Sequence, residues 1–82
     1  MHSHNFVDKY KGFVAFGFDR ATDENTLMYY LQKFSDDTLL NVLIKKMADT
    51  ELEEIFELVS KYLKKYLTEE EYHKLFLKDD NY

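Results

Sequence analysis

Glu70 and His73 have the Glu-x-x-His spacing that places a carboxylate and an imidazole on adjacent turns of a helix. In di-iron helical bundles such a pair holds metal together with a second pair and two further carboxylates. This chain has a single pair, and a helix with Tyr72 and Phe76 turned inward would turn Glu70 nearly the opposite way. We therefore predict a solvated first helical turn here, with no metal site and no cofactor.

Gly12 and Gly17 have the spacing of the two glycines in a phosphate-binding loop. That loop continues with Lys and then Ser or Thr, whereas Phe18 and Asp19 follow here. The residues between the two glycines are bulky and apolar, which would keep the backbone away from a phosphate. No serine lies in a glycine-flanked turn, and the chain has no cysteine nucleophile. We therefore predict a bend at the glycines and a protein that is not an enzyme.

Residues 37–66 have the outline of a helix-turn-helix, which makes a DNA-binding or transcription-related regulator the alternative function. Five lysines supply the candidate basic patch: Lys45, Lys46, Lys61, Lys64 and Lys65. The second helix would however begin with Glu51, Glu53 and Glu54, whose carboxylates would face DNA phosphates. The net charge of −5 also argues against nucleic acid as a partner.

The length of 82 residues predicts a single domain spanning 1–82, with frayed ends at 1–5 and 79–82. The absence of cysteine fits a reducing compartment, so a cytoplasmic location is expected. No apolar run is long enough to span a bilayer, and the first residues do not resemble a signal peptide. We therefore expect no membrane partner.

Apolar periodicity predicts an all-α fold, a compact bundle of four or five short helices. No glycine or proline follows Arg20, so caps must set the helix ends. The first predicted helix spans 24–34 with Asp23 as its N-cap, and the second spans 37–47 with Ser35 or Asp36 as its N-cap. A third helix of about 17 residues begins at Asp49 or Thr50, and Thr50 with Glu53 has the spacing of a capping box. Thr68 and Glu71 form a second capping box that opens a short fourth helix.

The N-terminal segment fits two descriptions. Phe6, Val7, Tyr10, Phe13, Val14 and Gly17 follow a helical stripe, while residues 13–18 alone also read as an aromatic, β-branched strand. We favour a helix, because a lone strand would have no pairing partner within the chain. A strand that pairs with its own copy in a dimer is the alternative.

The aromatic content of 17% exceeds what the core of one small domain can hide. We therefore predict a non-catalytic protein-interaction domain with an adaptor or structural role. We expect it to form a homodimer, so that its partner is a second copy of itself, another protein, or both. Tyrosine suits such a surface because its ring is apolar and its hydroxyl can stay wet. The candidate interface residues lie in the N-terminal segment and on two of the predicted helices: Phe13, Phe16, Tyr29, Tyr30 and Leu58.

Overall fold

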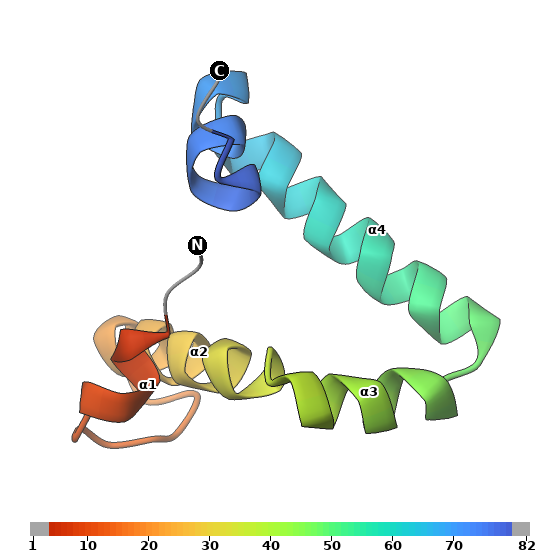
Figure 1. Ribbon diagram of the computed structural model, residues 1–82. Coiled ribbons are helices and arrows are strands. Elements are labelled where there is room, and N and C mark those ends of the chain that lie inside the picture. The colour runs from red at the N-terminus through yellow and green to blue at the C-terminus, as the bar shows by residue number, and fades with distance from the viewer. Residues whose placement is uncertain (1–3, 80–82) are drawn as a thin grey trace. The chain divides into compact units, whose positions relative to one another are not determined.

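The computed structural model describes residues 4–79, and the part it describes is all helix and loop without a strand. The elements in chain order are α1 (Asn5–Lys9), α2 (Arg20–Phe34), α3 (Asp37–Lys46), α4 (Asp49–Tyr66), α5 (Glu69–Glu71) and the π-helical turns η1 (Tyr72–Leu77) (Figure 1). The predicted all-α fold class is thereby confirmed. Of the ends predicted to fray, residues 1–3 and 80–82 lie outside the described residues. Asn5 already belongs to α1, and the backbone N–H of Asp79 donates to the carbonyl of His73 at 2.9 Å.

The chain divides into two units, one that carries α1, α2 and α3 and another that carries α4, α5 and η1. In the first unit α1 packs against α2 (Figure 1). The half-buried side chains there include Phe6, Tyr10 and Tyr29. The rings of Phe6 and Tyr10 stack at 5.0 Å between centroids, and Tyr10 lies 6.2 Å from Tyr29.

Helix α2 begins four residues before its predicted start, because Asp19 rather than Asp23 is its N-cap. The Asp19 carboxylate accepts hydrogen bonds from the Thr22 backbone N–H at 2.9 Å and from the Thr22 hydroxyl at 3.1 Å. Those bonds stabilise the charged form and lower the pKa of Asp19 below its usual value of 3.8. The Asp23 carboxylate instead accepts the backbone N–H of Gly17 at 2.8 Å.

The later helices begin close to where their caps were predicted. Asp36 accepts the backbone N–H of Leu39 at 3.0 Å ahead of α3. The Thr68 and Glu71 capping box is confirmed, with Thr68 Oγ1 accepting from Glu71 N at 3.1 Å and Glu71 Oε1 accepting from Thr68 N at 2.8 Å. The box predicted at Thr50 is wrong, because Glu51 Oε1 accepts from Ala48 N at 2.8 Å, which places the box two residues earlier.

The prediction of one helix through the N-terminal segment is wrong beyond Lys9, and the strand alternative is wrong as well. Residues 10–19 form an irregular loop without helix or strand. Two glycines explain the break: a Cβ at Gly12 would collide with the Tyr10 ring, and Gly17 adopts a φ of 99°, which disfavours other residues. Side chains of α2 then hold this loop, as described below.

Candidate interaction surface

An exposed apolar surface runs along α4, the longest helix among residues 4–79. Its residues recur every three or four positions and are called the α4 stripe: Leu52, Ile55, Phe56, Val59, Tyr62, Leu63 and Tyr66. Ile55 and Leu63 are half-buried, while the other five are exposed, up to 63% for Phe56 and 68% for Tyr66. Within residues 4–79 no apolar side chain is buried, so this stripe has no core to cover it there.

Charged side chains divide α4 into an acidic first half and a basic second half. The acids are Asp49, Glu51, Glu53, Glu54 and Glu57, and the bases are Lys61, Lys64 and Lys65. This order suits the helix macrodipole, whose positive end is the N-terminus. All of these side chains are exposed, so they remain able to meet charges on a partner.

The second half of α4 also carries a pair of stacked tyrosines. The rings of Tyr62 and Tyr66 lie 6.2 Å apart at an interplanar angle of 27°. Lys61 Nζ lies 5.3 Å from the Tyr62 ring and Lys65 Nζ lies 5.2 Å from the Tyr66 ring. These lysines therefore make cation–π contacts with their own helix. Lys64 lies on the same helix, whereas Lys45 and Lys46 are the last two residues of α3.

A second aromatic surface lies on the loop of residues 10–19. Phe13, Phe16 and Phe18 are 63%, 71% and 70% exposed, and the Phe13 and Phe18 rings meet edge to face at 5.4 Å. We call these three the loop phenylalanines. Sequence reasoning missed Phe18 as an exposed residue, although its place directly after Gly17 was a usable sign of a turn.

The loop phenylalanines are held outward because the backbone between them is bonded to α2. The backbone of Ala15 forms two hydrogen bonds with the hydroxyl of Thr26, and Gly17 N–H donates to Asp23. Thr26 is the one buried residue among positions 4–79, at 5% exposure. The exposed rings therefore sit on a fixed support rather than on a free loop.

The predicted interface residues are divided among three elements. Phe13 and Phe16 are on the loop, and Leu58, which is 51% exposed, is on α4 in the other unit. On α2, Tyr30 is 63% exposed, while its neighbour Tyr29 is half-buried against Tyr10. Lys33 Nζ also lies 5.1 Å from the Tyr29 ring.

Glu70 and His73, the two weak candidates for metal ligands, each contact a different charged side chain of the same chain. Glu70 Oε1 forms an ion pair with Lys74 Nζ at 2.8 Å, and His73 Nδ1 lies 3.3 Å from Asp79 Oδ2. In the stretch from His4 to Asp79, no three His, Cys, Asp or Glu side chains are grouped in a way that could hold a metal ion. Glu70 is therefore ion-paired with Lys74, and His73 lies beside Asp79, within the C-terminal turns.

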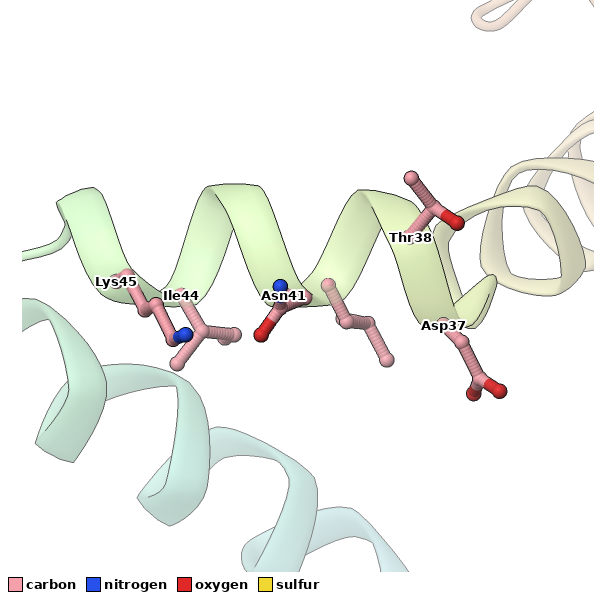
Figure 2. A pocket seen from close by; sticks show the side chains of 6 residues that line it. Asp37, Thr38, Asn41, Ile44 and Lys45 are labelled. Atoms are coloured by element: carbon pink, nitrogen blue, oxygen red, sulfur yellow. The ribbon is translucent and has the colours of Figure 1, made fainter.

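The hollows on the surface are open and shallow. The one drawn in Figure 2 runs along a single side of α3 and is lined by Asp37, Thr38, Leu40, Asn41, Ile44 and Lys45. Another lies between the end of α4 and η1, beside Leu63, Leu67, Tyr72 and His73. Neither has convergent polar groups in an enclosed apolar cavity, which is what small-molecule sites provide.

No protein-family model, curated protein or solved structure matches this chain. Among the helices of residues 4–79, none combines the length and the apolar character that crossing a membrane requires. The surfaces described above are therefore the basis for any functional inference.

Proposed function

We propose that this chain is a non-catalytic helical protein-interaction domain that works as a homodimer. The observation that carries the proposal is the exposure of the α4 stripe, including 63% of Phe56 and 68% of Tyr66. Burial of apolar surface contributes about 25 cal/mol per Å², and it is the main source of stability for an amphipathic helix. A partner that covers this stripe would supply the stabilising free energy of apolar burial.

The composition of the surface favours protein over membrane or nucleic acid as the partner. Exposed tyrosine and phenylalanine are enriched in protein interfaces. Helices that lie on membranes carry Lys and Arg on their polar face, whereas the first half of α4 carries acids. The lack of cysteine supports a reducing compartment such as the cytoplasm.

The helix-turn-helix alternative has less support. The first turns of α4 would have to enter the DNA groove, and they carry Glu51, Glu53 and Glu54. A gel-shift assay at low salt with mixed DNA separates the two functions. We expect the DNA band to migrate unshifted at all protein concentrations. A band of reduced mobility would contradict our proposal and favour the DNA-binding function.

The proposal is tested by the solution mass, measured by light scattering after size-exclusion chromatography at several concentrations. We expect a mass near twice that of the 9.9 kDa chain, with dissociation on dilution. A mass of one chain at every concentration would contradict the homodimer. The exposed stripe would then have to be covered by a different protein or by the rest of the chain.

A further inference from the structure

The α4 stripe is symmetric about Val59. Phe56 and Tyr62 lie three residues to either side of it, Ile55 and Leu63 four residues, and Leu52 and Tyr66 seven residues. A second α4 helix that runs in the opposite direction, with Val59 against Val59, would therefore place every apolar residue of the stripe level with another one.

The charges of α4 are reversed about the same point. Glu57 and Lys61 lie two residues to either side of Val59. Glu54 and Lys64 lie five residues away, and Glu53 and Lys65 lie six residues away. Reversal of the helix direction therefore places acids level with bases. The macrodipole explains why acids precede bases, but it does not require both patterns to share one centre.

We infer that two copies of this chain pair through α4 in antiparallel orientation, with Val59 at the two-fold axis. This inference rests on the proposed homodimer and specifies its surface. Phe56 then lies near the partner's Leu63, which is on the same side of the stripe, and Leu52 lies near the partner's Tyr66. Closed two-fold contacts of this kind are the commonest arrangement in soluble oligomers.

The flanks of α4 favour the antiparallel pair over a parallel one. Glu53 and Lys64 are eleven residues apart, about three turns, so they share one flank of the stripe. Glu54 and Lys65 have the same separation and share the other flank. In an antiparallel pair each flank adjoins the same flank of the other copy, so Glu53 approaches the partner's Lys64.

A parallel pair would bring opposite flanks together at equal height. Glu53 would then approach the partner's Glu54, and Lys64 would approach the partner's Lys65. Like charges at such positions are destabilising, and interfaces use this effect to select orientation. The charge pattern of α4 thus opposes the parallel arrangement at both ends of the helix.

The area available on α4 is sufficient for a small interface. The helix has 18 residues and is about 27 Å long. A fully buried aromatic side chain removes about 150–250 Å² from water. With the exposed fractions of Phe56, Tyr62 and Tyr66 at 63%, 47% and 68%, and with Leu52 and Val59 added, two copies bury on the order of 1,000 Å². That figure matches the lower bound, about 1,000 Å², for a specific interface.

Disulfide trapping tests the orientation, because the chain has no cysteine of its own. Val59→Cys is expected to form a covalent dimer on mild oxidation. Leu52→Cys alone is expected to remain uncrosslinked, because the two thiols would be about 21 Å apart along the helices. A mixture of Leu52→Cys and Tyr66→Cys chains is expected to crosslink with each other. Lys61→Cys, on the opposite side of α4, is the matched control and should not crosslink.

The solution mass of each variant is also measured by light scattering. This measurement separates a failure of the antiparallel orientation from a failure of the homodimer itself. A dimer in which Leu52→Cys crosslinks with itself would overturn the antiparallel pair and leave the homodimer intact. A dimer in which Val59→Cys does not crosslink would move the interface away from α4. A single-chain mass for the unmodified protein would overturn the proposed function and this inference together.

Discussion

The hydroxyl of Thr26 bonds to both backbone groups of Ala15. It accepts the Ala15 N–H at 3.1 Å and donates to the Ala15 carbonyl at 2.7 Å. Thr26 is buried in the middle of α2, and Ala15 lies in the middle of the loop that carries the loop phenylalanines. One side chain therefore replaces the hydrogen bonds that regular secondary structure would have given to this point of the loop.

Thr26→Val is expected to lower the free energy of unfolding by about 1–3 kcal/mol, because it leaves the Ala15 amide and carbonyl without a partner. Urea unfolding followed by circular dichroism measures the change. Thr26→Ser keeps the hydroxyl and is the matched control. If the Val variant is as stable as the unmodified protein while the Ser variant is not, the two hydrogen bonds are not what stabilises the loop.

Asp19 is expected to make α2 sensitive to acid. Its pKa is lowered in the folded chain by hydrogen bonds from Thr22, so its contribution to stability is complete above the usual value of 3.8. That contribution is lost as the pH falls through the lowered pKa. Asp19→Asn keeps an N-cap acceptor without a charge. Between about pH 5 and 2 the melting temperature should therefore fall less for Asp19→Asn than for the unmodified chain. An equal fall in both proteins would contradict this role of Asp19.

Replacement of Lys78 by glycine is expected to raise the stability of the protein. It follows η1 with a φ of 57°, in the left-handed region, and the next residue, Asp79, donates its N–H to the His73 carbonyl. A residue with a Cβ pays about 1 kcal/mol or more for this conformation. Lys78→Gly should therefore raise stability by about 1 kcal/mol in denaturant unfolding. Lys78→Ala removes the same long side chain without relieving the backbone, and a comparable gain there would refute the explanation.

Val59→Lys is expected to weaken self-association at least tenfold, about 1.4 kcal/mol, because it places two like charges face to face at the proposed two-fold axis. Sedimentation equilibrium gives the dissociation constant. Phe16→Ser removes a 71% exposed ring from the loop and should leave the dissociation constant unchanged. The reverse result would assign the interface to the loop phenylalanines.

The helices were predictable because their signals are local. Apolar residues at three- and four-residue spacing defined α4, and Thr68 with Glu71 carried its own capping geometry in the sequence. Asp19 and Asp23 are both good N-cap residues four positions apart, and the choice between them depends on the bond from Gly17 to Asp23. Such a bond between loop and helix leaves no trace in periodicity.

The interaction surface was less predictable, because periodicity shows which residues share a face and not what covers that face. The predicted interface residues included Tyr30 and Leu58 but none of the residues of the α4 stripe. In the structure Phe56 and Tyr66, on the stripe itself, are more exposed than Leu58. Tyr29 was predicted to be an interface residue, whereas its contact with Tyr10 leaves it half-buried.

The bonds from α2 to the loop also set how this part of the chain opens. An irregular loop ordinarily exchanges its amide hydrogens with solvent quickly. Here the amides of Ala15 and Gly17 donate to Thr26 and Asp23, two side chains of α2. Their exchange with deuterium should therefore follow the opening of α2, so that loop and helix behave as one cooperative folding unit.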